Sequence, residues 1–481
     1  MTENPIGENQ SGFFLGPSCM GTMLGARHLC AAPFRFLEYP RMPALPHDAQ
    51  LPVEATRRRE FLRQLFWSAG GMGGMGALGL SWPGLAQAAA SASMPVTSLN
   101  APAASGFDFS TLGPLREPDA LGLALPAGFT ARIVAVSGER PVSGASVWHT
   151  YPDGGATFAA PDGGWAYANN SEVPLGVGGV STLRFDRHGQ VVGAHRILSG
   201  TSSNCAGGAT PWGTWLSAEE VSLGRVWECL PFGSASQALP RPALGIFKHE
   251  AVAVDPRHRT LYLTEDEGQG RFYRFVCSES DWPASAARPA LKSGRLQVLQ
   301  IDGVAPNQVP PDEVDLARPH RVSWVDVSSP GLPQSAVRGV LGSKAPGTVF
   351  RGGEGLWYFN GVVYFSTKGD NRIWAFEVAT QQLQVIYDFA TASAADRVLS
   401  GVDNLTVSRR GDVLVAEDGG NMELCVILPD RRVKVLLRVH GQDQSEITGP
   451  AFSPDGTRLY FNSQRGGRQG LGLTYEVKLP A

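Results

Sequence analysis

The chain has 481 residues, of which 43% are hydrophobic and 18% charged, a composition typical of a globular protein with a packed core and not of a disordered chain. Its formal net charge is −3 and its one basic run is Arg57-Arg58-Arg59, which argues against a nucleic-acid partner. The 58 glycines and 35 prolines favour an all-β fold with many turns.

The N-terminal part of the chain predicts export. Residues 58–63 read Arg-Arg-Glu-Phe-Leu-Arg, a twin-arginine motif, and a Gly/Ala-rich stretch follows it. Ala86-Gln87-Ala88 then offers a small-residue cleavage site. A membrane anchor is the alternative interpretation, but the many glycines and Pro83 disfavour it. We therefore expect recognition by the twin-arginine export machinery, no stable membrane anchor, and a periplasmic or secreted protein.

These motifs divide the chain into four parts. Residues 1–41 are unlike the start of a signal peptide, so they are either disordered or a mis-called start upstream of Met42. Residues 42–88 form the predicted twin-arginine signal peptide, and residues 89–120 form a linker. The folded domain is expected over residues 121–481.

The predicted domain contains a repeated unit, in which a short β-type run ends in a polar triplet. The triplets end at residues 170, 219, 266, 368, 418 and 464. Four of the intervals are 46 to 50 residues long and one is 102. Such a period predicts a six-bladed β-propeller with one four-stranded sheet per blade. Seven blades are the alternative, although residues 304–348, within the long interval, contain no second copy and are expected to be a loop insertion.

Each repeat also predicts outer strands. Residues 271–275 and 372–376 are candidate third strands, and residues 296–299 and 383–386 are candidate fourth strands. The last repeat has no obvious fourth strand of its own. Residues 130–136 can supply it and close the ring without an open edge.

The propeller geometry predicts a site. In each blade the innermost strand follows the central axis and the second strand returns antiparallel, so the start of the first and the end of the second share one face. Polar residues occur at both positions in several repeats. The inner-strand set is Cys205, Glu250, Glu354, Asp403 and Asn404. The second-strand set is Asn170, Glu219, Glu220, Glu265, Asp266, Glu417 and Asp418.

Carboxylates this dense would repel one another in a partly desolvated pocket unless cations neutralised them. Oxygen ligands suit calcium, and a thiolate among them suits a transition metal such as iron. The alternative is that each acid only caps a turn at a blade end. Repetition of the set in four repeats favours metal binding. Cys205, Cys229, Cys277 and Cys425 have no CxxC spacing, and two disulfides among them remain possible.

The same residues carry a resemblance to a known family. The motifs are Asn204–Gly208 (NCAGG), Thr210–Glu220 (TPWGTWLSAEE), His249–Pro256 (HEAVAVDP), Tyr262–Asp266 (YLTED), Gly353–Gly355 (GEG) and Asp403–Val407 (DNLTV). In order and spacing this series resembles the PhoX family of secreted alkaline phosphatases, from about Leu121 to the C-terminus.

The resemblance implies a six-bladed propeller that hydrolyses small phosphate monoesters at an axial cluster of iron and calcium. It implies Cys205, Glu250 and Glu354 as ligands on the iron side. It implies Glu220, Asp266, Asp403 and Glu417 on the calcium side. Glu265, Asn404 and Asp418 complete the candidate metal set from the repeat geometry.

The chain departs from the family at one position. The family usually has an arginine two residues before the glutamate of an Arg-Gly-Glu-Gly run, and Gly352 stands there in this chain. A guanidinium binds phosphate oxygens in a bidentate manner. Arg351, Lys368 and Arg465 are the candidates to replace it. The candidate catalytic residues are therefore Glu220, Arg351 and Lys368.

Two other functions stay open. A calcium-dependent propeller hydrolase of the lactonase type would use the acids but leave Cys205 without a role. A non-catalytic, metal-bound propeller could instead hold a ligand or a protein partner. Iron together with calcium would favour the phosphatase, and calcium alone the lactonase type. His249 is either a ligand or a hydrogen-bonded strand histidine.

Overall fold

The computed structural model describes residues 106–480. The twin-arginine motif, the cleavage site and the possible start at Met42 lie outside these residues. Nearly all of the regular secondary structure in the described domain is strand, which confirms the predicted all-β, propeller-like class. Between residues 106 and 480 no helix combines the length and the hydropathy needed to cross a bilayer.

The local sequence explains the hairpins. β16 (Gly353–Phe359) and β17 (Val362–Thr367) are rich in aromatic and β-branched residues, which favour strands. Asn360 and Gly361 join them with φ angles of 47° and 87°. Asn-Gly with two positive φ angles is the preferred two-residue turn between antiparallel strands, because its twist matches that of the strands.

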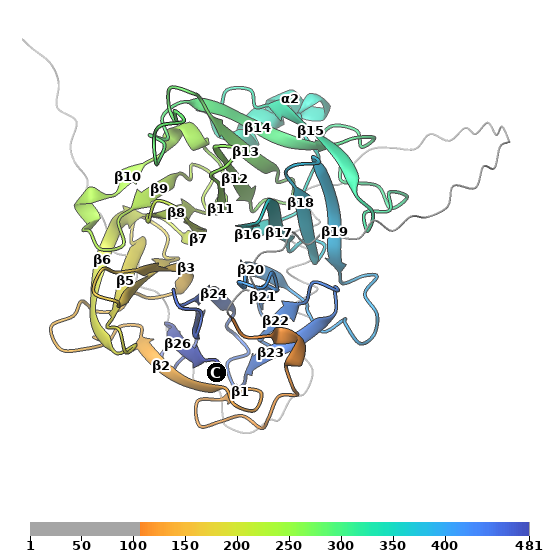
Figure 1. Cartoon of the computed structure of the whole chain (residues 1–481). Helices are drawn as coiled ribbons and strands as arrows, with labels where there is room; N and C mark the ends of the chain where they lie inside the picture. The colour runs from red at the N-terminus through yellow and green to blue at the C-terminus, as the bar shows by residue number, and fades with distance from the viewer. Residues whose placement is uncertain (1–105, 481) are drawn as a thin grey trace, which may run out of the picture. The chain divides into compact units, whose positions relative to one another are not determined.

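The strands form five sheets in the described residues, and in each the inner strand comes first (Figure 1). The first sheet is β3 (Pro152–Ala159), β4 (Trp165–Ser171), β5 (Gly178–Phe185) and β6 (Val191–Thr201). The second is β7 (Asn204–Ala209), β8 (Trp215–Glu219), β9 (Val226–Cys229) and β10 (Leu239–Pro240). The fourth is β20 (Val402–Val407), β21 (Val413–Glu417), β22 (Glu423–Ile427), β23 (Val433–Val439) and β1 (Leu123–Ala124). The fifth is β24 (Ile447–Phe452), β25 (Arg458–Ser463), β26 (Leu473–Lys478) and β2 (Thr130–Val136).

The third sheet has nine strands. It runs from the inner strand β11 (His249–Asp255) through β12 (Thr260–Glu265), β13 (Phe272–Cys277), β14 (Gly294–Ile301) and β15 (His320–Asp326). It then returns through β19 (Gln382–Asp388), β18 (Arg372–Glu377) and β17 to the inner strand β16. The count of six separate blades is therefore not confirmed by the sheets.

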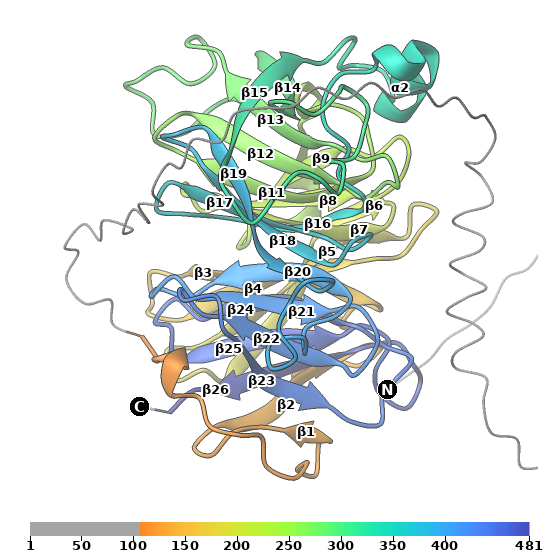
Figure 2. The ribbon, with the colours of Figure 1, turned by 90° about the vertical axis from the view of Figure 1, so that its right-hand side faces the viewer.

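The reason is a strand inside the region expected to be a loop. β15 lies within residues 304–348 and pairs with β14 on one edge and β19 on the other. The same region contains α2 (Gln334–Leu341), which lies at the outer edge of the domain beside β14 (Figure 2). This segment is thus an ordered connection between two groups of strands, and not loop alone.

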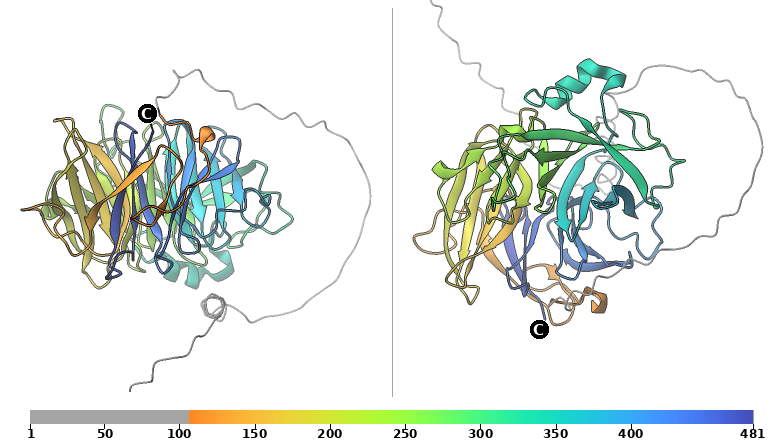
Figure 3. Two further views of the ribbon diagram at one scale, coloured as in Figure 1. Left: turned by 90° about the horizontal axis from the view of Figure 1, so that it is seen from below. Right: turned by 45° about the horizontal axis from the view of Figure 1, so that its top comes forward.

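The predicted ring closure is confirmed. β2 pairs antiparallel with β26, from Thr130 opposite Lys478 to Val136 opposite Leu473. The left-hand view of Figure 3 shows the sheets edge-on, and the right-hand view shows them around one centre. The residues before β1 also belong to the packed domain, since Phe109 and Leu112 are buried in the core with β22, β23 and β26. The packed domain therefore begins before Leu121, inside the expected linker.

Candidate metal centre

An irregular register repeats at one end of the inner hairpins. In five hairpins the first pair is followed by a bulge: Pro152 with Ser171, Asn204 with Glu219, His249 with Glu265, Gly353 with Thr367, and Val402 with Glu417. A bulge re-aims side chains at the end of a sheet. The residues next to these pairs are Asp153, Cys205, Glu250, Glu354 and Asp403 on the inner strands, and Glu172, Glu220, Asp266, Lys368 and Asp418 after the second strands.

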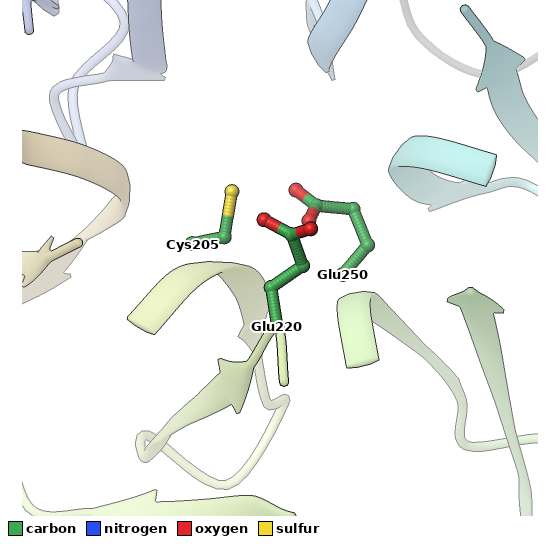
Figure 4. A group of neighbouring side chains, drawn as sticks. All are labelled: Cys205, Glu220 and Glu250. Atoms are coloured by element: carbon green, nitrogen blue, oxygen red, sulfur yellow. The ribbon is translucent and has the colours of Figure 1, made fainter. Parts of the chain in front are cut away.

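The first ligand group combines a thiol with two carboxylates. Possible ligand atoms of Cys205, Glu220 and Glu250 lie within 4.8 Å of one another, and the three side chains point toward one another (Figure 4). Glu250 is fully buried, and neither of its carboxylate oxygens has a hydrogen-bond partner among the described residues. A buried, unpartnered carboxylate is costly unless a cation or a proton compensates it.

Two further groups continue from the first. Glu250, Glu354 and Asp403 form one, and Asp403, Asp418 and Glu446 form the next, each within the same 4.8 Å limit. Because Glu250 and Asp403 are each shared by two groups, the three groups form one continuous cluster. The mixed set with Cys205 suits a transition metal, and the all-oxygen set around Asp418 suits calcium.

The electrostatics of the metal-free cluster are unfavourable for carboxylates. Burial, with repulsion from Asp266, raises the pKa of Glu220 to about 8. Burial, with repulsion from Asp418, raises the pKa of Asp403 to about 7. Burial also raises the pKa of Glu250 and that of the Cys205 thiol well above their ordinary values. The metal-free protein thus holds protons where a loaded protein would hold cations, which fits a cation site.

Three basic side chains border the cluster. The Nζ atom of Lys368 lies 2.6 Å from Glu354 Oε1 and 2.9 Å from Asp266 Oδ2. Lys248 Nζ lies 3.9 Å from Glu220 Oε1. Arg465 pairs with Glu446 and lies 3.6 Å from Glu172. Among the described residues, they leave Glu250, Asp403 and Asp418 of the ligand groups without an ion pair.

Two predicted ligands turn away from the cluster. Glu265 accepts hydrogen bonds from the backbone N–H of Arg271, the Tyr273 hydroxyl and the Arg338 guanidinium of α2. Glu417 accepts hydrogen bonds from the backbone N–H groups of Ser400 and Glu423. Each is the last residue of a second strand, and the residue that follows it lies at the axial cluster. These hydrogen bonds fix the loops of their own sheets, and possible ligand atoms of Glu417, Glu423 and Cys425 lie within 4.8 Å of one another in a separate, fourth group.

Glu219 and Asn170 also have supporting positions. Glu219 accepts hydrogen bonds from the Ser202 backbone and the Trp227 indole. Asn170 donates to the backbone carbonyls of Cys205 and Ala206, which holds the start of β7 in place. Asn404 links Asp403 to Gly449. Its side-chain amide N–H donates to the Asp403 carboxylate, and its side-chain oxygen accepts from the Gly449 backbone N–H.

His249 is not among the ligand groups. Its ring packs against Phe247 with 3.6 Å between the centroids, and its Nε2 lies 3.2 Å from the Gly245 carbonyl oxygen. Burial lowers its pKa to about 3. The strand-histidine interpretation is the one that the structure supports. Arg351 is likewise outside the three ligand groups.

Three acids at the cluster were not predicted from the sequence: Glu446, which belongs to a ligand group, and Asp153 and Glu172, which lie beside the groups. Asp153 lies 3.6 Å from the Cys205 thiol and accepts a hydrogen bond from Gln464, which also donates to Glu172. Glu446 immediately precedes β24. Asp153 was missed because β3 and β4 are each two residues longer than β7 and β8, so Asp153 lies further along the chain from the end of its hairpin than Cys205 does from the end of its own.

Fold and site together define an all-β, propeller-like protein with a buried axial cluster suited to cations. The family model of the alkaline phosphatase PhoX matches residues 179–226, 221–382 and 367–467, which is more than half of the chain. The chain belongs to the PhoX family. This membership supports a hydrolase of the alkaline-phosphatase type and agrees with the metal dependence of that family.

One solved structure supports the fold, and a second is similar at a lower score. PhoX of Pseudomonas fluorescens in complex with vanadate, a transition-state analogue, is similar with a TM-score of 0.61 at 17% identity, over 78% of this chain and 98% of that one. A gluconolactonase from Xanthomonas campestris has a TM-score of 0.41 at 14% identity, over 77% of this chain and 98% of that one. A search of curated proteins finds no match.

Proposed function

We propose that this protein is an exported, metal-dependent phosphoesterase that hydrolyses small phosphate monoesters at the axial cluster. The observation that carries the proposal is Glu250, which is fully buried, shared by two ligand groups and without a hydrogen-bond partner among the described residues. A cation is the natural partner of such a carboxylate. Membership of a phosphatase family indicates that the bound cation would serve phosphate-ester hydrolysis.

The proposal also gives a blade count. β11 to β14 and β16 to β19 each run from an inner to an outer strand, as the smaller sheets do. We count the nine-stranded sheet as two blades linked by β15, which gives six.

In this proposal Cys205, Glu220 and Glu250 hold iron, and Asp403, Asp418 and Glu446 hold calcium. Bound cations would polarise a phosphoryl group and make a water more acidic. Lys368 has three N–H donors, of which Asp266 and Glu354 take two, and its side chain is 38% exposed. The third donor can orient a phosphate oxygen where Gly352 replaces the usual arginine.

Cys205→Ala tests the assignment of iron. The thiolate is the softest ligand of the cluster, so the variant should lose iron more than calcium, and hydrolysis of an aryl phosphate should fall with the iron. Elemental analysis and turnover are measured together, with Cys229→Ala as control, because Cys229 is a buried core cysteine outside all three ligand groups. Unchanged iron in Cys205→Ala would refute the assignment.

The wild-type protein distinguishes the other functions in the same assay. Calcium alone, with hydrolysis of a lactone and not of a phosphate, would favour the lactonase type. Full occupancy by iron and calcium without any turnover would favour a binding protein.

Export is tested separately. Replacing Arg58-Arg59 by Lys-Lys should leave a folded precursor in the cytoplasm, because the machinery recognises the arginine pair. Cell fractionation measures the distribution. Normal delivery of the variant to the periplasm would refute twin-arginine export.

A further inference from the structure

Lys368 occupies a position that carries an acid in the neighbouring hairpins. It directly follows the second strand β17, as Glu172 follows β4, Glu220 follows β8, Asp266 follows β12 and Asp418 follows β21. Its hairpin has the same bulged register as the other four. The structure therefore places a positive charge at a point of the ring where four other hairpins place a negative one.

The Lys368 ammonium group lies against the middle one of the three ligand groups. That group consists of Glu250, Glu354 and Asp403, and Lys368 Nζ lies 2.6 Å from Glu354 Oε1. The same nitrogen lies 2.9 Å from Asp266 Oδ2, so it bridges two carboxylates that come from different inner hairpins. A divalent ion between acids of neighbouring blades would make the same kind of bridge.

The backbone makes room for this lysine. Gly352 has a φ of +63°, and a Cβ atom there would lie 2.9 Å from Lys368 Cγ and 3.2 Å from Asp266 Oδ1. Any side chain at residue 352 would displace the lysine or strain the turn. Lys368 can therefore take this position only because residue 352 has no side chain.

We propose that Lys368 is the resident cation of the middle ligand group, so that metal ions bind only in the two outer groups. This inference rests on the proposed metal centre. Lys368 compensates Glu354 permanently, Cys205 with Glu220 and Glu250 forms one metal pocket, and Asp403 with Asp418 and Glu446 forms the other. The lysine separates the two pockets and keeps their ions from sharing Glu354.

Lys368→Met tests the inference by removing the charge while keeping most of the side-chain length. The variant should bind one more divalent ion per chain than the wild type, because Glu354 and Asp266 then need a new partner. Without metal it should also melt at a lower temperature than the wild type, and added calcium should reverse this loss. Elemental analysis, calcium titration and thermal unfolding of the metal-free and calcium-loaded proteins measure these effects.

Lys248→Met is the matched control. Lys248 also borders the cluster, but it makes one contact of 3.9 Å and bridges no pair of acids. Its loss should leave the number of bound ions unchanged. Lys368→Gln, which keeps a hydrogen-bond donor, is the second neutral variant and should also gain one ion.

The outcomes decide the inference. A folded Lys368→Met or Lys368→Gln protein with the wild-type number of ions would overturn it. Failure of both variants to fold even with calcium would also overturn it, because no ion would then replace the lysine. Folding only in the presence of calcium supports it. A wild-type protein that binds no metal at all would instead refute the proposed function itself.

Discussion

Glu250→Gln should lose metal and activity together. Glu250 belongs to two of the three ligand groups, and both of its buried oxygens are available to a cation. Loss of a residue that only supports a ligand typically costs 10–100-fold in affinity, so loss of this direct ligand should cost at least about 100-fold. Phosphate-ester hydrolysis should fall by a similar factor. Elemental analysis and steady-state kinetics measure the two effects.

Glu219→Gln provides the matched control. It makes the same chemical change at the same end of the domain, but Glu219 accepts hydrogen bonds from Ser202 and Trp227 and does not belong to a ligand group. Its metal content should equal that of the wild type. If Glu250→Gln kept the full metal content while folded, the cluster would not be the metal centre.

Removal of metal should make stability strongly dependent on pH. In the metal-free protein the pKa of Glu220 is raised to about 8, mainly by burial and next by repulsion from Asp266. The pKa of Asp403 is raised to about 7, mainly by burial and next by repulsion from Asp418. An acid whose pKa is raised by folding contributes stability that is fully present below its unfolded pKa, near 4, and is lost as the pH rises through the folded value. The melting temperature of the metal-free protein should therefore fall between pH 5 and pH 9.

The calcium-loaded protein is the comparison. Ions bind the deprotonated carboxylates, so stabilisation by calcium should grow over the same pH range. We expect the melting temperatures with and without metal to differ by roughly 5 °C or more at pH 9 and by less at pH 5. Thermal unfolding at both pH values, with chelator or with calcium, measures the difference. A gap of equal size at both would contradict the proposed role of the buried acids.

The repeat in the sequence was enough to predict the hairpins and the end of the domain at which the acids collect. Glu250, Glu354 and Asp403 follow directly from it, as does closure of the ring by residues 130–136. The strand-terminal acids Glu265 and Glu417 were harder, because a shift of one residue reverses the direction of a side chain in a strand. Only the bulged register shows which member of each acid pair faces the axis.

Other features depend on contacts that no local pattern encodes. β15 joins two groups of strands by pairing with segments far apart in the chain. Glu446 precedes its strand by one residue, whereas the predicted inner-strand residues lie within theirs. The pairing of Lys368 with Glu354 and Asp266 depends on the space left at Gly352, which a sequence comparison shows only as a missing arginine.

The pairing of β2 with β26 has a consequence for biosynthesis. Thr130 lies near the beginning of the described domain and its partner Lys478 near its end. The pairing of β2 with β26 therefore cannot form until the chain has been synthesised beyond Lys478, and closure of the fifth sheet is a late contact between distant segments. A domain that closes this late fits the twin-arginine route proposed above, which carries folded proteins.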